Sequence, residues 1–387
     1  MKHFLFVFGT RPEAIKLFPL ARVLRARGAR VTLLATAQHT DMMADVVDAF
    51  GISPDLTLSP LPKGRTLTEL IRQILAMLPR YLTSLTPDAI VVQGDTASAF
   101  AGALVGFLSG VRVIHIEAGL RTYDTTSPFP EEAFRRAIAT FASVHFAPSE
   151  YAHAHLLAEG VSGEIYTVGN TVLDALAALC PPRCPTANPY AILTTHRRES
   201  AGEGREAIFR AVRRLAARYR DFSFIYPVHK SESIAALAEQ MLGGVPNITL
   251  SPPVPPDAFY RLLAGARLIL TDSGGLSEEG AALGIPTFVL REKTEREAEL
   301  LTGRLTLVGT DEERIYRAVS AQIESCCSPL TAQTSENEKI PMASCDAIGQ
   351  SDSPSEKIAD IILEDSKELQ TYEQSYPMRD GDAFLRL

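Results

Sequence analysis

Short apolar runs alternate along the first half of the chain with longer segments whose apolar residues recur at helical spacing. The runs that predict buried strands are Phe4–Phe8, Val31–Ala35, Ala89–Val92, Val113–Ile116 and Tyr166–Val168, with Phe146 between the last two. Helices are predicted over Pro12–Arg27, Leu67–Leu78 and Ser98–Leu108, and Pro79 is expected to end or kink the second of them. Strands that alternate with helices in this way predict a parallel sheet with crossover helices.

The same pattern starts again after the proline-rich stretch Pro181–Pro189. Its predicted strands are Ile192–Thr194, Ser223–Tyr226, Ile248–Leu250, Leu268–Leu270 and Thr287–Leu290. Two successive units of this kind predict an α/β fold with two doubly wound, Rossmann-like domains that face a cleft. We expect the first domain over residues 1–170 and the second over residues 171–345. Residues 346–387 are expected to form a C-terminal helix and tail, with the helix over Ile358–Glu368 packing back on the first domain.

The charge balance of the 387-residue chain is acidic, because 38 Lys and Arg against 46 Asp and Glu give a formal net charge of −8. A nucleic-acid-binding protein is expected to carry a concentrated basic face, so this class is not favoured. With 46% hydrophobic and 22% charged residues, the chain has the composition of a globular protein. The polar stretch Ser328–Glu356 departs from this average and is expected to be a loop.

Membrane insertion and secretion are also not favoured. The longest charge-free apolar stretch, Thr96–Val111, is broken by glycines and falls short of the roughly 20 residues that a spanning helix needs. The apolar run Phe4–Phe8 is shorter than the core of about 7–15 residues found in a signal peptide. Five cysteines are few for this length, which fits a reducing compartment, and their spacing lacks the histidine partners of a zinc site. These observations predict a cytoplasmic protein without a bound metal.

A candidate phosphate site follows the first predicted strand. Open α/β sheets bind ligands at the carboxyl ends of their strands, and Gly9 to Pro12 lie at such an end and open a helix. Backbone amides at the helix start, together with Arg11 and with Lys16 one turn later, predict a phosphate-binding turn. The alternative is a plain strand–helix turn with surface cations.

Three acidic residues fall at similar places in the first half. Asp95 and Glu117 each come directly after a predicted strand, and Glu131 precedes a predicted helix. A single acidic residue such as Glu131 is often only a helix cap. Three that converge on one cleft favour another interpretation, because crowded carboxylates raise one another's pKa and are then suited to proton transfer.

The strongest local signal in the second half is a strand followed by Ser273, Gly274 and Gly275 and then by a helix. Glycines at this point allow backbone amides to approach a diphosphate closely. Glu279 lies one helical turn further, where its carboxylate can accept hydrogen bonds from ribose hydroxyls. A simple glycine turn with a capped helix is the alternative.

Two further strand ends carry cations. His196 stands beside two arginines after the first strand of the second half, a combination that suits an anionic leaving group, although a basic surface turn is the alternative. Arg296 follows the last predicted strand, and His229 lies at a strand end with no role assigned. These features suggest a nucleotide diphosphate on the second domain and acid–base chemistry on the first, as in an enzyme that acts on sugar nucleotides.

These motifs, in this order, resemble the non-hydrolysing bacterial UDP-N-acetylglucosamine 2-epimerases. The stretches that carry the resemblance are Phe8–Leu20, Gln93–Thr96, His115–Arg135, Val168–Leu176, His196–Ser200, Leu270–Leu283 and Thr294–Arg296, within about residues 1–313. The resemblance implies the two-domain fold of B-type glycosyltransferases. It also implies interconversion of UDP-N-acetylglucosamine and UDP-N-acetylmannosamine through elimination of UDP to a glycal and its re-addition. Such a reaction needs no cofactor and no metal.

Site residues follow from the resemblance position by position. Asp95, Glu117 and Glu131 match the acid–base carboxylates, and the sequence does not say which acts on which face of the sugar. His196 and Arg135 match residues that hold the leaving diphosphate or support the acids. The matched diphosphate contacts are Arg11, Lys16, Ser273, Gly274, Gly275 and Arg296, while Glu279 matches the ribose contact and Phe259 a residue beside the uracil. The expected partners are a UDP-sugar substrate and a second copy of the chain, since family members are commonly homodimers.

Some positions depart from the family pattern. Phe134 stands where an asparagine is usual, and Val254 and Pro256 replace the residues typical around the uracil. Thr40 replaces the arginine of a turn near which regulated members bind a second substrate molecule, and Arg65 stands where a glutamine is common, so substrate activation is not predicted. Three alternatives stay open: a hydrolysing epimerase that releases N-acetylmannosamine and UDP, a glycosyltransferase of the same fold, and a sugar-nucleotide-binding protein without turnover.

Overall fold

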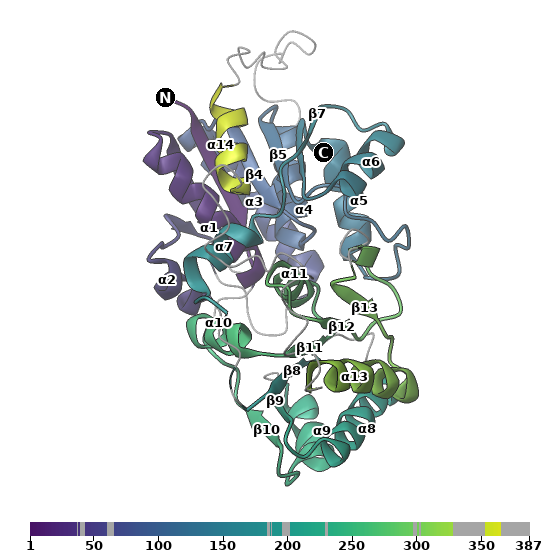
Figure 1. Cartoon of the computed structure of the whole chain (residues 1–387). Coiled ribbons are helices and arrows are strands. Elements are labelled where there is room, and N and C mark those ends of the chain that lie inside the picture. Colours follow the sequence, from purple (N-terminus) through teal and green to yellow (C-terminus); the bar gives the residue numbers. More distant parts are fainter. Residues whose placement is uncertain are drawn as a thin grey trace, which may run out of the picture. The chain divides into compact units, whose positions relative to one another are not determined.

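In the computed structural model, the chain folds into two compact units (Figure 1). The first unit comprises Met1–Thr171 together with Asp352–Leu387, and the second unit comprises Val172–Ser351. The structure describes residues 1–36, 38, 43–59, 66–183, 186, 188–195, 202–228, 231–296, 300–301, 303–327 and 353–364. The division between Thr171 and Val172 lies in the segment where the sequence pattern changes.

A parallel sheet forms the centre of the first unit. Its strands are β1 (His3–Phe8), β2 (Arg30–Ala35), β3 (Leu56–Thr57), β4 (Ala89–Gln93), β5 (Arg112–Ile116), β6 (Val144–Ala147) and β7 (Glu164–Thr167), in the order β3-β2-β1-β4-β5-β6-β7. From β1 the chain winds outward through β2 to β3, and from β4 it winds the other way to β7. The two halves of the sheet therefore meet at β1 and β4, which is the point where doubly wound sheets bind ligands.

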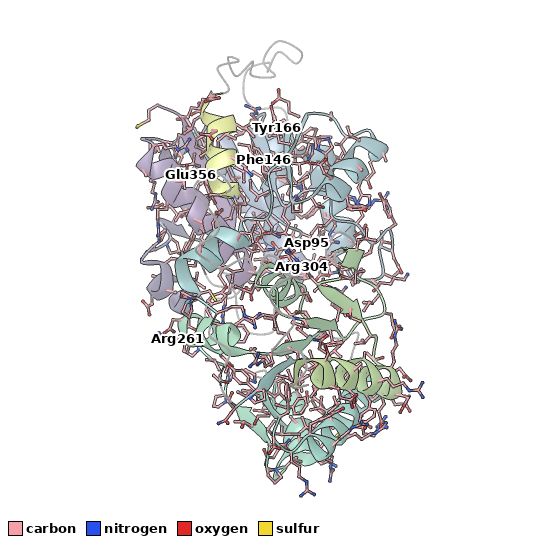
Figure 2. All side chains as sticks on the ribbon, in the orientation of Figure 1. Asp95, Phe146, Tyr166, Arg261, Arg304 and Glu356 are labelled. Atoms are coloured by element: carbon pink, nitrogen blue, oxygen red, sulfur yellow. The ribbon has the colours of Figure 1, made fainter. Side chains whose placement is uncertain are left out.

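Helices cover the first sheet. They are α1 (Arg11–Ala26), α2 (Met43–Phe50), α3 (Leu67–Leu85), α4 (Ala97–Leu108), α5 (Glu131–Phe141), α6 (Glu150–Glu159) and α14 (Pro354–Glu364). Helix α4 packs against β1, β4 and β5 and against both α3 and α5. An added Cβ on its Gly102 would lie 3.1 Å from Val7 of β1 and 3.2 Å from Val92 of β4, so the missing side chain lets the helix approach the sheet. The rings of Phe146 and Tyr166 stack between β6 and β7, with centroids 5.7 Å apart (Figure 2).

Pro79 does not end its helix, contrary to one of the two expectations for it. Helix α3 continues past Pro79 to Leu85. Pro79 is exposed, and the residues that face the core on either side of it are Leu70, Ile74, Leu78 and Leu82. A helix in a protein gains most of its stability from such an apolar stripe. Burial on both sides of Pro79 therefore outweighs the hydrogen bond that proline cannot make.

Helix α14 returns the chain to the first unit after it has passed through the second. It packs against α1, and it begins at Pro354 rather than at Ile358. Lys2 Nζ donates to the Ile362 carbonyl at 2.7 Å. The guanidinium of Arg27 forms ion pairs with Glu356 (labelled in Figure 2) and with Asp360.

The second unit is a smaller doubly wound sheet. Its strands are β8 (Tyr190–Thr194), β9 (Ser223–Pro227), β10 (Ile248–Ser251), β11 (Leu268–Thr271), β12 (Thr287–Val289) and β13 (Leu305–Leu307), in the order β10-β9-β8-β11-β12-β13 and all parallel. Its helices are α7 (Val172–Leu179), α8 (Glu203–Arg218), α9 (Glu232–Leu242), α10 (Pro256–Gly265), α11 (Gly274–Ala282) and α13 (Glu312–Cys327). The two halves of this sheet meet at β8 and β11.

The predicted fold class is confirmed, since each unit is built on a parallel α/β sheet. The sequence analysis did not predict two of the strands, β3 and β13. β3 has only two residues, and β13 has three, of which Thr306 is exposed and only Leu305 is fully buried. Within the described ranges, we find no helix with the length and apolar character that crossing a membrane requires.

Candidate functional site

The turn between β1 and α1 is tightly packed and is closed by its own helix. An added Cβ on Gly9 would overlap Ser98 Oγ and Thr36 Oγ1, so no larger residue fits there. The fully buried carboxylate of Glu13 accepts the backbone N–H groups of Gly9, at 3.0 Å, and of Thr10, at 2.7 Å. The predicted phosphate site needs amides of this turn, but these two donate to Glu13. Two backbone amides of this turn are therefore engaged by a helix cap, and the phosphate contact there stays a prediction.

Lys16, one of the two cations predicted for the same turn, contacts a carboxylate. Its buried ammonium forms an ion pair with Glu117, and Gln93 Nε2 donates to Glu117 Oε2 at 2.7 Å. Glu117 has a φ of 64°, in the left-handed region that side-chain-bearing residues seldom adopt. Backbone strain of this kind concentrates at functional sites. Arg11, the second cation, is the first residue of α1 and is partly exposed.

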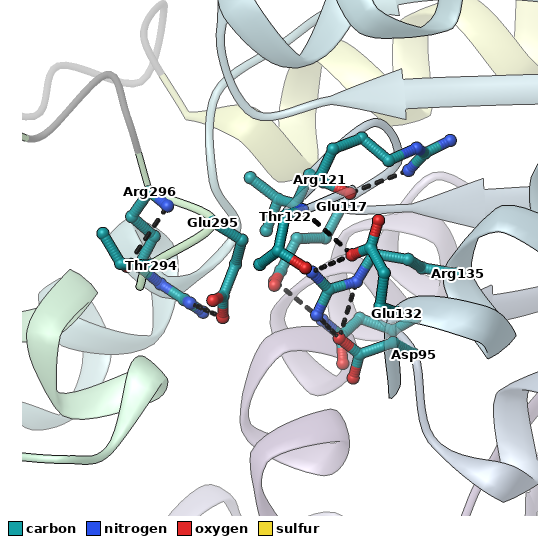
Figure 3. Close-up of polar contacts among 12 residues, drawn as sticks. Asp95, Glu117, Arg121, Thr122, Glu132, Arg135, Thr294, Glu295 and Arg296 are labelled. Atoms are coloured by element: carbon teal, nitrogen blue, oxygen red, sulfur yellow. Dashed lines mark hydrogen bonds and ion pairs between the residues drawn. The ribbon is translucent and has the colours of Figure 1, made fainter. Parts of the chain in front are cut away.

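Asp95 is held by a buried arginine. Arg135, from α5, donates through Nε to Asp95 Oδ2 at 3.1 Å and forms an ion pair with the same carboxylate, as Figure 3 shows. The Asp95 side chain keeps 28% of its surface exposed, whereas that of Arg135 keeps 4%. Asp95 and Glu117 follow the neighbouring strands β4 and β5, so their carboxylates lie at the same edge of the sheet. The structure thus brings together two of the three predicted acid–base residues.

Glu132 completes this group, and the sequence analysis assigned it no role. Its buried carboxylate accepts from Arg135 Nη1 at 3.1 Å and from the backbone N–H groups of Thr122, at 3.0 Å, and Tyr123, at 3.1 Å (Figure 3). It therefore ties the loop after β5 to α5 and holds Arg135 toward Asp95. The spacing of Glu132 and Arg135, three residues apart on one helix face, is a signal that could have identified it.

Glu131, the third predicted carboxylate, is the first residue of α5 and is half-buried. It precedes Glu132 directly at the start of α5, the helix that also carries Arg135, the partner of Asp95. His196, Thr40 and Arg65 lie outside the described residues.

His115 fixes the turn before Asp95 from another side. Burial lowers the pKa of His115 to about 3, so the imidazole is neutral at pH 7. Its Nε2 lies 2.8 Å from the carbonyl oxygen of Gly94, which can only accept, so Nε2 carries the proton. Gly94 has a φ of 69°, which glycine tolerates without strain.

In the second unit, the first turn of α11 has the geometry of an anion site. Ser273 caps the helix, with its Oγ 3.5 Å from the Leu276 backbone N–H. An added Cβ on Gly274 would lie 2.7 Å from Arg296 Nη1, so the guanidinium rests directly on this glycine. An added Cβ on Gly275 would meet nothing within 4 Å. A helix start with a guanidinium on one glycine and open space at the next is suited to a phosphate group.

Two buried carboxylates hold Arg296 in this position. Its Nε donates to Glu278 Oε1 at 2.9 Å, and its Nη1 forms an ion pair with Glu295 (Figure 3). Glu295 also accepts from Arg291 Nη1 at 3.2 Å. Side chains held on several sides are pre-organised for binding, because little freedom is left to lose. Glu278 and Glu295 lie within stretches that carry the family resemblance, and the sequence analysis gave neither a role.

Glu279 lies on α11 and accepts from the hydroxyl of Tyr260 at 3.0 Å. Tyr260 is buried on α10, where the half-buried Phe259 precedes it with ring centroids 6.3 Å apart. The predicted ribose contact and the predicted uracil neighbour are therefore linked through one tyrosine. In the parts of the chain that the structure describes, no group of three His, Cys, Asp or Glu side chains could hold a metal ion.

Comparison with known proteins agrees with this geometry. The sequence model of the UDP-N-acetylglucosamine 2-epimerase family matches residues 22–362. The UDP-N-acetylglucosamine 2-epimerase of Bacillus subtilis is 40% identical over 324 residues, which cover 80% of this chain and 84% of that protein.

Two solved structures extend the comparison to the fold. The crystal structure of UDP-GlcNAc 2-epimerase from Neisseria meningitidis bound to UDP-GlcNAc is 32% identical, with a TM-score of 0.84 over 94% of this chain and 100% of that one. The glycosyltransferase of kitacinnamycin is only 15% identical, with a TM-score of 0.56 over 94% of this chain and 98% of that one, and shares the fold alone. The chain belongs to the UDP-N-acetylglucosamine 2-epimerase family.

Proposed function

We propose that the protein interconverts UDP-N-acetylglucosamine and UDP-N-acetylmannosamine by inversion at C2, without release of the free sugar. The observation that carries the proposal is the pairing of Asp95 with the buried Arg135, at the same sheet edge as the Lys16–Glu117 pair. Membership of the family and the similarity to an epimerase bound to UDP-GlcNAc support the substrate.

The reaction needs a base and an acid on opposite faces of C2. A carboxylate takes the C2 proton while the C1–O bond to UDP breaks, and the electron pair of the C–H bond forms the C1–C2 double bond of a glycal. A second carboxylic acid then returns a proton to C2 from the other face as UDP adds back at C1. Asp95, Glu117 and Glu131 are the groups proposed for these transfers. Arg135 supports Asp95 through the ion pair between them.

UDP is assigned to the second unit. Arg296 and the open first turn of α11 suit the diphosphate, with Ser273, Gly274 and Gly275 at its start. Glu279 is proposed for the ribose and Phe259 for the uracil on the basis of the resemblance, and Tyr260 contacts both residues. Arg11 and His196 are proposed as further contacts of the diphosphate on the basis of the resemblance.

One departure from the family pattern is explained by packing. The ring of Phe134, which replaces the usual asparagine, stacks on Phe100 of α4 at 4.9 Å between centroids and 14° between planes. This contact fills the space between α4 and α5, so the substitution needs no change of chemistry. Phe134 is therefore no reason to prefer the hydrolysing alternative.

Proton NMR of UDP-N-acetylglucosamine with the purified protein in deuterated water tests the proposal. We expect UDP-N-acetylmannosamine to accumulate with deuterium at C2, because the proton removed exchanges with solvent before return. Free N-acetylmannosamine with UDP would place the protein in the hydrolysing class. Sedimentation analysis of the purified protein tests the predicted homodimer. We also propose that the protein is cytoplasmic.

A further inference from the structure

Two turns meet where the halves of the first sheet join. β1 and β4 are hydrogen-bonded neighbours, and each is followed by a short turn and a helix, α1 after β1 and α4 after β4. The first turn carries Gly9 and Thr10. The second carries Asp95, the proposed acid–base residue, followed directly by Thr96.

A single buried carboxylate joins the two turns. Glu13 Oε2 accepts the N–H groups of Gly9 and Thr10, and Glu13 Oε1 accepts from Thr96 Oγ1 at 2.6 Å. The Thr96 oxygen itself accepts the Ala99 N–H at 3.0 Å as the cap of α4. The Thr96 hydroxyl proton is therefore directed at Glu13, and the side chain has one orientation that satisfies both neighbours.

The Asp95 turn is thereby fixed from three directions. Arg135 holds the carboxylate, His115 holds the Gly94 carbonyl that precedes it, and Glu13 holds the Thr96 hydroxyl that follows it. Of these three, Glu13 alone belongs to α1. That helix also carries Lys16, the partner of Glu117.

We propose that Glu13 is a positioning residue for the reaction: its carboxylate holds the Asp95–Thr96 turn against α1 and so sets where the Asp95 carboxylate stands relative to Glu117. The inference rests on the proposed function for its catalytic consequence. Misplacement of a reacting group by about 1 Å can cost a hundredfold in rate, so a residue without contact to the sugar can still control turnover.

The desolvation penalty of burying an ionisable carboxyl group at position 13 supports the inference. Burial raises the pKa of Glu13 to about 7, although hydrogen bonds from Thr96, Gly9 and Thr10 act in the opposite direction. A neutral side chain could cap α1 with less desolvation.

The same chain offers a matched control in Glu69. It forms the same capping box with Thr66 at the start of α3, where it accepts the Thr66 N–H at 2.7 Å, but it is exposed. Glu69→Gln therefore makes the same carboxylate-to-amide change in an equivalent cap without touching the Asp95 turn.

Glu13→Gln tests the proposal, since glutamine keeps the size but offers one acceptor oxygen to three donors. Above about pH 8, where the carboxylate is ionised, we expect kcat to fall about tenfold or more while KM and the Kd for UDP stay within about twofold. Glu69→Gln should match the wild type in all three. Thr96→Val should reproduce the loss and Thr96→Ser should restore it, and adding Glu13→Gln to Thr96→Val should cost little more.

Hydrogen–deuterium exchange of a peptide spanning residues 94–100 gives a second result that does not depend on turnover. We expect faster exchange there in Glu13→Gln and none of this change in Glu69→Gln. Unchanged exchange, or a kcat within about twofold of the wild type, would overturn the role of Glu13. A wild-type protein without turnover would instead refute the proposed function, and the exchange result would still decide whether Glu13 holds the Asp95 turn.

Discussion

The turn that opens α1 and the turn that opens α11 start from the same pattern, a buried strand followed by glycine and a helix, yet the structure uses them differently. At α1, the carboxylate of Glu13 takes the N–H groups of Gly9 and Thr10. At α11, the guanidinium of Arg296 rests on Gly274, and the space beside Gly275 is open. Both are positions where an anion can sit. At α1, the protein's own Glu13 carboxylate occupies that position.

The difference shows that a glycine turn at a helix start is not by itself a phosphate site. The residue three positions into the helix decides: a glutamate there caps the helix, as Glu13 does, whereas α11 has Leu276 within its first turn. The first unit is thus organised around fixed carboxylates and the second around a fixed guanidinium. This is the division that the proposed proton transfer at C2 and the proposed binding of the diphosphate require.

The largest effect should come from Asp95→Asn, which separates the two functions. We expect turnover to fall about a thousandfold, because a proton-transfer group is removed. UDP affinity, measured by calorimetry, should stay within about twofold, because Asp95 is not among the proposed UDP contacts. Glu313→Gln is the control, since Glu313 of α13 forms exposed ion pairs with Arg214 and Arg317. Loss of UDP binding in Asp95→Asn would break the comparison.

The next effect concerns the internal anion of α1. The pKa of Glu13 is raised from 4.5 to about 7 in the folded protein, so the ionised form is the one that folding disfavours. The stabilisation from a protonated Glu13 is complete below about pH 4.5 and is lost as the pH rises through about 7. The free energy of unfolding of the wild type, relative to Glu13→Gln, should fall by about 2 kcal/mol between pH 5 and 8. Urea titrations at both pH values measure it, and a constant difference would contradict the raised pKa.

The smallest effect is expected at α11. An alanine Cβ at position 274 would stand 2.7 Å from Arg296 Nη1, and this guanidinium is held by Glu278 and Glu295 and cannot easily move away. Gly274→Ala should weaken UDP binding about tenfold. Gly275→Ala meets open space in the protein, so any loss of UDP affinity there reports the approach of UDP itself. If both variants bind UDP as the wild type does, the diphosphate is not on this turn.

The fold could be predicted from the sequence because it follows from the spacing of the apolar residues. The strand-end carboxylates could be predicted because they follow directly after predicted strands. Apolar runs marked the longer strands, and parallel strands gather their carboxyl ends at one edge, so Asp95 and Glu117 could be placed together. Glu13 could not, because it lies in an apolar helical pattern and its importance depends on Thr96, far away in the sequence. Glu132 was missed because the sequence analysis assigned the acidic role at this helix start to the adjacent Glu131. The helix end predicted at Pro79 was wrong because tertiary packing overrides local helix preference.

Helix α14 has a consequence for how the chain matures. Its partner α1 is among the first segments to leave the ribosome, whereas α14 emerges only after the whole of the second unit has been synthesised. Until then, the side of α1 that receives α14, with Lys2 and Arg27 beside it, has no partner from this helix. Domains generally fold in the order in which they are made. Here the first unit is begun first and completed last, so a ribosome that stalls within the second unit leaves both of them unfinished.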